Sequence, residues 1–77
     1  MRCKYLLDFG DFNLEADNIP ELVKLYFDNY DRIIDKFYSR YVWNGKNYEF
    51  MNYDDYKSYA KYWNYYNKKR LIEQDFV

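Results

Sequence analysis

The chain has 77 residues, of which 20 are aromatic, 12 are Lys or Arg and 13 are Asp or Glu, and its formal net charge is −1 at neutral pH. This length allows one hydrophobic core, and therefore one domain over residues 1–77, which buries only about 60–65% of its unfolded surface. With no histidine, one cysteine and two glycines, the chain lacks the side chains for a zinc or haem site, a catalytic triad, a Cys–His pair or a nucleotide-phosphate loop.

Residues 4–16 alternate between apolar and polar side chains, which is the pattern of a half-buried β-hairpin. Gly10 and Asp11 supply the turn, and the glycine provides the backbone freedom that a turn needs. The apolar face of the two strands consists of Tyr5, Leu7, Phe9, Phe12, Leu14 and Ala16.

A helix is predicted to follow Asn18. Asn18 is a favourable N-cap, Pro20 lies in the first turn where its missing N–H costs nothing, and Glu21 is three residues after the cap. The helix extends to about Tyr30, whereas residues 31–36 fit either more helix or a short strand, because short apolar runs satisfy both periods. The buried face is expected to comprise Ile19, Leu22, Val23, Tyr26, Tyr30 and Ile33.

Residues 37–51 indicate a second hairpin. The run FYSRYVW is rich in aromatic and β-branched residues, as expected of a first strand. Asn44-Gly45 favours a two-residue type I′ turn, and KNYEFM is expected to form the second, antiparallel strand. The register decides which side chains lie on the sheet face that the helices leave open. The two alternatives for that face are Tyr38, Arg40 and Val42, or Phe37, Tyr41 and Trp43.

The stretch from Asn52 to Arg70 predicts a long amphipathic helix. Asn52 is the expected N-cap, and Asp55, three residues later, can complete a capping box with it. The cations at residues 68–70 lie near the C-terminal end, where they interact favourably with the helix dipole. Tyr62 and Tyr65 fall outside the expected buried face, and residues 71–77 form a tail that either frays or docks through Leu71, Ile72 and Phe76. The expected buried face comprises Tyr56, Tyr59, Ala60, Trp63 and Tyr66.

The element order ββαββα predicts a small α+β domain in which an antiparallel sheet carries its helices on one face. We expect no enzyme, because the one carboxylate pair, Asp54 and Asp55, consists of helix neighbours that point about 100° apart. We expect no cofactor or metal, and no membrane partner, because no apolar run approaches the ~20 residues that cross a bilayer. Cys3 is expected to be a small strand residue. A chain this short needs stability beyond that of its own core, and self-association into a homodimer would supply it.

Two kinds of binding surface remain. Residues 1–35 hold eight Asp or Glu against four Lys or Arg, a balance of −4, whereas residues 36–77 hold five against eight, a balance of +3. In one hypothesis the basic side of the last helix binds nucleic acid, with lysines on phosphates and tyrosines stacked on bases. In the other, tyrosines and the acidic half bind a protein partner, in a basic groove that normally holds nucleic acid. The candidate binding residues are Tyr62, Tyr65, Lys57, Lys61, Lys68, Asp28, Asp31 and Asp35.

Tyr, Asn, Lys and Ile make up 32 of the 77 residues, the bias expected of an AT-rich coding sequence from a bacterium or its phage. In this bias, its small size and its lack of catalytic side chains, the chain resembles the small phage-encoded inhibitors of bacterial defence systems, of which the anti-CRISPR proteins are the best-known kind. The resemblance implies stoichiometric binding to a nucleic-acid-handling protein in the cytoplasm of a bacterial host cell. Nucleic-acid binding by the last helix and a structural homodimer are the alternatives.

Overall fold

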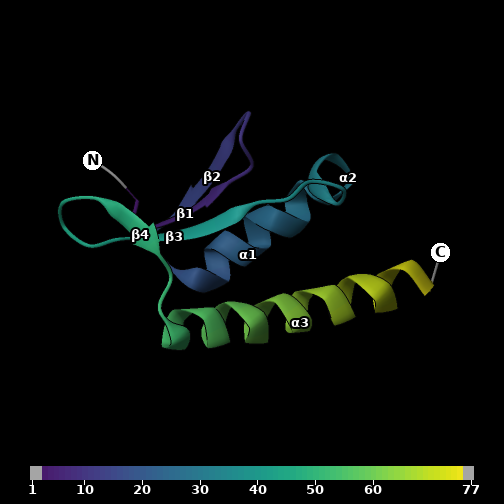
Figure 1. Ribbon diagram of the computed structural model, residues 1–77. Coiled ribbons are helices and arrows are strands. Elements are labelled where there is room, and N and C mark those ends of the chain that lie inside the picture. Colours follow the sequence, from purple (N-terminus) through teal and green to yellow (C-terminus); the bar gives the residue numbers. More distant parts are fainter. Residues whose placement is uncertain (1–2, 76–77) are drawn as a thin grey trace.

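The computed structural model describes residues 3–75. Within them the chain forms strands and helices in the order ββααββα, and the strands make one antiparallel sheet with α1 and α3 on the same side of it (Figure 1). This arrangement confirms the predicted α+β fold. The elements are β1 (Tyr5–Asp8), β2 (Asn13–Ala16), α1 (Ile19–Asp28), α2 (Tyr30–Ile33), β3 (Ser39–Trp43), β4 (Tyr48–Phe50) and α3 (Tyr53–Asp75).

The sheet has the strand order β2-β1-β3-β4, so β2 and β4 form its edges. Leu7 of β1 lies opposite Leu14 of β2 on one side and opposite Arg40 of β3 on the other. Because successive side chains of a strand point to opposite faces, this register turns Leu7 and Arg40 toward the helices and Leu6 away from them. The two faces of the sheet therefore have different compositions.

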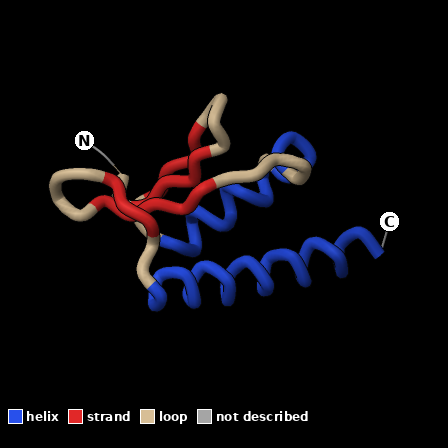
Figure 2. Tube along the Cα trace, viewed as in Figure 1, coloured by secondary structure: helices blue, strands red, loops and turns tan. Residues whose placement is uncertain are grey.

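The core lies between the sheet and α1, and α3 runs beside α1 (Figures 1 and 2). Leu22 and Val23 of α1 are fully buried there, and Tyr59 of α3 is the largest of the fully buried side chains. Aromatic contacts join the two helices, with the ring of Tyr26 centred 6.1 Å from that of Trp63. The core consists of Tyr5, Leu7, Phe9, Ala16, Ile19, Leu22, Val23, Tyr26, Ile33, Val42, Met51 and Tyr59.

Both predicted helix starts are confirmed by their hydrogen bonds. The side chain of Asn18 accepts from the backbone N–H of Glu21 at 2.9 Å, and the Asn18 amide donates back to the Glu21 carboxylate at 3.4 Å. The side chain of Asn52 accepts from the backbone N–H of Asp55, also at 2.9 Å. Each bond satisfies one of the N–H groups that a helix start leaves without a partner.

The segment 31–36, for which the sequence allowed helix or strand, begins as helix. Asn29 interrupts the first helix, since its side-chain amide donates to the carbonyl oxygen of Leu25 at 2.8 Å. The chain then continues as the short helix α2, which places Ile33 in the core with no exposed surface. Burial of Ile33 in the core thus favours helix over strand at this position.

The prediction of a two-residue turn at Asn44-Gly45 is wrong. Trp43 lies opposite Tyr48, so residues 44–47 connect β3 to β4. The side chain of Asn44 accepts from the backbone N–H groups of Lys46 and Asn47, both at 2.8 Å, and this side-chain acceptor stabilises the longer connection. Gly45 adopts a φ of +99° there, a conformation that favours glycine.

Helix α3 also differs from its prediction in extent and in the face that it buries. It continues through the expected tail to Asp75, with Leu71 and Ile72 about half exposed, while Phe76 lies outside the described residues. Ala60, predicted to be buried, is exposed, and Tyr56 is 43% exposed. Tyr62, predicted to lie outside the buried face, packs half-buried against the core. The contacting stripe is rotated because α3 packs mainly against α1 and not directly onto the sheet.

Candidate functional site

The sheet face that points away from the helices, which we call the open face, carries a cluster of aromatic side chains. One row of opposed residues crosses all four strands, and it consists of Glu15, Leu6, Tyr41 and Phe50. The rings of Tyr41 and Phe50 stack with their centroids 5.1 Å apart and their planes 23° apart. Phe50 is nevertheless 71% exposed, so the stack presents a large apolar surface to solvent.

A second aromatic pair lies beside this row on the open face. The rings of Trp43 and Tyr48 meet edge to face with their centroids 5.1 Å apart. The Tyr48 hydroxyl donates to the carbonyl oxygen of Cys3 at 2.6 Å and lies 3.4 Å from the Glu15 carboxylate, so its side chain reaches across the sheet from β4. Leu6 is only 8% exposed although neither α1 nor α3 lies on this side. We attribute its burial to the surrounding rings.

The two alternatives that the sequence left for this face are thereby resolved. Tyr41 and Trp43 lie on the open face, whereas Arg40 and Val42 point toward the helices. Phe37 belongs to neither face, because it precedes β3, and it is 99% exposed. Sequence reasoning did not single out Phe50, although its even spacing from Tyr48 in a short apolar return strand is the signal that identifies it.

The charged side chains that the described strands place on the open face are negative. Asp8 and Glu15 project from β1 and β2 on this side, and the strands place no Lys or Arg there. Arg40, the one cation within the described strands, lies on the opposite face. The open face therefore combines exposed aromatic surface with two carboxylates.

The lysines predicted to form a basic stripe are all exposed on α3. The Lys57 ammonium lies 5.3 Å from the centre of the Tyr53 ring, and that of Lys61 lies 6.0 Å from the centre of the Tyr62 ring. Lys68 borders a shallow apolar groove that Tyr65, 61% exposed, and Ile72 also line. The solvent side of α3 thus carries cations interleaved with tyrosines, as predicted.

The predicted acidic residues do not gather into one surface with Lys57 and Lys61, and Asp28 lies nearer to the end of α3 that carries Lys68. Asp28 lies at the end of α1, in a groove that Lys69 and Arg70 of α3 also line. Lys69 is twelve residues, or about 18 Å of helix, from Lys57. Asp31 lies in α2 and Asp35 follows it, and both are exposed.

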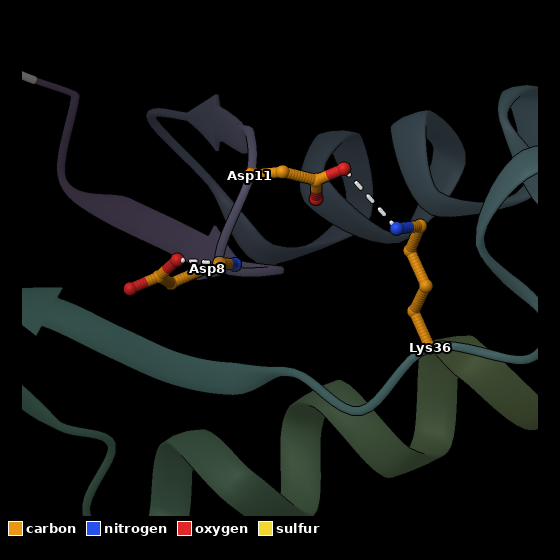
Figure 3. Close-up of polar contacts among 4 residues, drawn as sticks. Asp8, Asp11 and Lys36 are labelled. Atoms are coloured by element: carbon orange, nitrogen blue, oxygen red, sulfur yellow. Dashed lines mark hydrogen bonds and ion pairs between the residues drawn. The ribbon is translucent and has the colours of Figure 1, made fainter.

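The connection between α2 and β3 is tied to the β1–β2 connection by an ion pair. Figure 3 shows the Lys36 side chain extending to Asp11, with its Nζ atom 3.1 Å from an Asp11 carboxylate oxygen. Nearby, Asp8 accepts from the backbone N–H of Gly10 at 2.8 Å. The ion pair therefore links the segment that carries the exposed Phe37 to the β1–β2 connection.

This ion pair gives a pH-dependent prediction. The hydrogen bond from Lys36 lowers the pKa of the Asp11 carboxyl. A lowered pKa in the folded state means that the pair stabilises the fold above the unfolded-state pKa, and that this contribution is lost as the pH falls through the folded-state pKa. Lys36→Met should therefore raise the pKa of Asp11, as measured by NMR titration of its carboxyl carbon. Lys46→Met removes a distant exposed cation and should leave that pKa unchanged; equal values in both variants would contradict the assignment.

The described residues offer few side chains suited to catalysis. Partial burial and the neighbouring Asp17 and Glu15 raise the pKa of the Cys3 thiol, which keeps it protonated and weakly nucleophilic. Among residues 3–75, no group of three or more Cys, Asp or Glu side chains is placed to hold a metal ion. Within the same residues, no helix has the length and apolar character required to cross a bilayer.

Comparison with known proteins assigns no family or function to the chain. No family model, curated protein or solved structure matches the chain.

Proposed function

We propose that this protein is a non-enzymatic protein-binding module, and that the open face is its docking surface. The observation that carries the proposal is the exposed ring of Phe50, which is held by its stack on Tyr41. Aromatic residues at the centre of an apolar patch are the type that dominates the binding energy of protein interfaces. The fitting partner is a protein surface with an apolar centre and basic side chains opposite Asp8 and Glu15.

We further propose that the protein acts by stoichiometric binding, as a phage-type inhibitor of a bacterial defence or nucleic-acid-handling complex in the cytoplasm of the host cell. The support is the combination of a binding surface with a chain that lacks histidine and has one weakly nucleophilic cysteine. A complex that handles nucleic acid offers basic surfaces, which complement the carboxylates of the open face.

The charge of the open face argues against nucleic acid as its ligand. Four-stranded sheets do bind single-stranded RNA by stacking bases on exposed aromatic rings. Such binding also requires cations for the phosphates, because phosphate contacts supply most of the affinity. Asp8 and Glu15 would repel a phosphate backbone from this face. If the protein binds nucleic acid, the surface that favours it is the solvent side of α3, where Lys57, Lys61 and Lys68 are exposed with Tyr65.

Affinity capture from bacterial lysate, with and without nuclease, tests the proposal. We expect the tagged protein to retain a protein partner at a fixed stoichiometry after nuclease treatment, and to lose it when Tyr41 and Phe50 are both changed to alanine. The matched control is Lys57→Ala with Lys61→Ala, which should leave the capture intact. Recovery of nucleic acid that depends on these lysines, or a protein retained equally by the Tyr41/Phe50 variant, would overturn the proposal. Light scattering at several concentrations detects the remaining alternative, a homodimer.

A further inference from the structure

Arg40 is held in an aromatic enclosure on the helix side of the sheet, away from the open face. Its guanidinium carbon lies 4.0 Å from the centre of the Tyr56 ring, and 5.4 Å from the centres of both the Tyr38 and Tyr59 rings. Tyr56 and Tyr59 belong to α3, and Tyr38 directly precedes β3. The half-buried Arg40 side chain therefore bridges the sheet and α3.

Stacking on rings leaves the hydrogen-bonding edge of this guanidinium free. The ring contacts engage the face of the planar group, whereas its five N–H donors point outward in the plane. Among the described residues, no carboxylate lies within 4.0 Å of Arg40 and no group accepts a hydrogen bond from its side chain. A half-buried guanidinium normally has a carboxylate, a carbonyl oxygen or water as its acceptor. The donors of Arg40 are thus available to a ligand.

A surface pocket opens beside Arg40, lined by Tyr38, Arg40, Tyr59, Ala60, Trp63 and Asn64. The hydroxyl oxygens of Tyr38 and Tyr59 are 3.1 Å apart, and either can be the donor. Two hydroxyls carry two protons and their mutual bond uses one, so the other proton remains for a ligand. Burial raises the pKa of Tyr59, which keeps that hydroxyl a donor at neutral pH. The amide of Asn64 adds further N–H donors.

The pocket and its rim favour negative charge. None of its six lining residues is acidic. Lys57 lies three residues before Ala60 on α3, which puts it on the same side of the helix, and it lines the neighbouring pocket together with Ala60. A cation that presents a planar row of donors, with hydroxyl and amide donors beside it, matches the geometry of a carboxylate or phosphate group.

We propose that the Arg40 pocket binds a compact oxyanion, a carboxylate or a phosphate group, through the edge of the Arg40 guanidinium. The hydroxyl pair of Tyr38 and Tyr59 and the amide of Asn64 supply the remaining hydrogen bonds, and the ring of Trp63 forms an apolar wall. The alternative is that Arg40 only joins α3 to the sheet through its ring contacts, in which case oxyanions bind it no better than any other arginine.

Arg32 provides an internal comparison within the same chain. Its guanidinium carbon lies 4.0 Å from the centre of the Phe12 ring, the same distance as Arg40 from Tyr56. Phe12 carries no hydroxyl, and the Arg32 side chain is exposed. Arg32 therefore reproduces the ring stacking of Arg40 without the donors that surround Arg40.

NMR of the full chain tests the site. Sodium acetate and sodium phosphate are titrated separately at neutral pH, with sodium chloride adjusted to hold the ionic strength constant, while the side-chain N–H signals of the arginines are followed. We expect the Arg40 signal to shift and saturate at millimolar anion, and the Arg32 signal to shift little and without saturation. The anion that saturates at the lower concentration identifies the preferred group. Equal, non-saturating shifts at Arg40 and Arg32 with both anions would overturn the proposal.

Ala60→Leu tests the contribution of the pocket while the charge of Arg40 stays unchanged. Leucine is a good helix former and Ala60 is exposed, so the variant should fold while its larger side chain fills the pocket. We expect at least a tenfold loss of anion affinity in Ala60→Leu and a similar loss in Arg40→Lys, which keeps the charge but not the planar edge. Leu71→Ala, on an exposed part of α3 outside the pocket, is the matched control and should bind as the unchanged protein does. Unchanged affinity in Ala60→Leu would refute the assignment of the pocket.

Discussion

Replacing Tyr59 by alanine should lower the free energy of unfolding by about 3–5 kcal/mol, the usual cost of removing a buried aromatic ring. Tyr59 is 2% exposed and is the largest of the fully buried side chains in the described chain. It joins α3 to the segment that leads into β3, where its hydroxyl meets that of Tyr38. At roughly 0.05–0.15 kcal/mol per residue, a domain of 77 residues has a total stability of about 4–12 kcal/mol, so the loss is a large fraction of it. Urea unfolding followed by circular dichroism measures the change.

Tyr59→Phe is the control for this prediction, because it keeps the ring and removes only the hydroxyl. The loss should be about 0.5–1.5 kcal/mol, which is typical of one neutral hydrogen bond. Near-equal stabilities of the alanine and phenylalanine variants would mean that the ring does not pack in the core. A loss in Tyr59→Phe that disappears in the background of Tyr38→Phe would assign the effect to the bond between the two hydroxyls.

The features that sequence predicted well depend on nearby residues. The caps at Asn18 and Asn52 each require one side chain to reach a backbone N–H three residues away, and both bonds form. The alternation in residues 4–16 likewise follows from the pleat of a single strand pair, and the observed register places Tyr5 opposite Ala16 as that alternation requires. These local interactions act in the same direction as the final packing, so a pattern in the sequence was sufficient.

The buried face of α3 could not be derived in the same way. Tyrosines at 53, 56, 59, 62 and 65 follow a three-residue spacing, which drifts around a helix of 3.6 residues per turn and leaves several faces equally aromatic. The choice depends on α1, whose Tyr26 and Phe27 contact Trp63. That contact rotates α3 so that Tyr62 packs inward and Ala60 faces solvent.

The candidate sites depend on strand register, which turn residues alone do not determine. A two-residue connection at Asn44-Gly45 would have paired Trp43 with Lys46, whereas the observed four-residue connection pairs Trp43 with Tyr48 and Tyr41 with Phe50. A shift of two residues keeps every side chain on its face but changes its neighbours. The stacked Tyr41–Phe50 pair is therefore a product of packing between strands. The side of Arg40 is set instead by its pairing with Leu7 of β1, which turns Arg40 toward α3 and its tyrosines.

Phe50→Asp should weaken binding of the captured protein partner by about 30-fold or more, equivalent to roughly 2 kcal/mol or more at an interface hot spot. Phe50 is 71% exposed on a three-residue edge strand, so the substitution removes contact surface while costing the fold little. An added carboxylate also places a charge beside the ring of Tyr41 within the apolar patch, where desolvation is unfavourable. Titration calorimetry with the purified partner measures the change, and unfolding by urea verifies that stability is retained.

Phe37→Asp is the matched control, since it makes the same chemical change at a phenylalanine that is 99% exposed but lies outside the open face. If apolar exposure alone caused binding, the two variants would lose affinity equally, or Phe37→Asp would lose more. If the open face is the docking surface, Phe37→Asp should stay within about threefold of the unchanged protein, since residues outside an interface contribute little to its energy. A large loss in Phe37→Asp with normal binding by Phe50→Asp would move the interface to the α2–β3 connection, which carries Phe37 next to the Lys36–Asp11 ion pair.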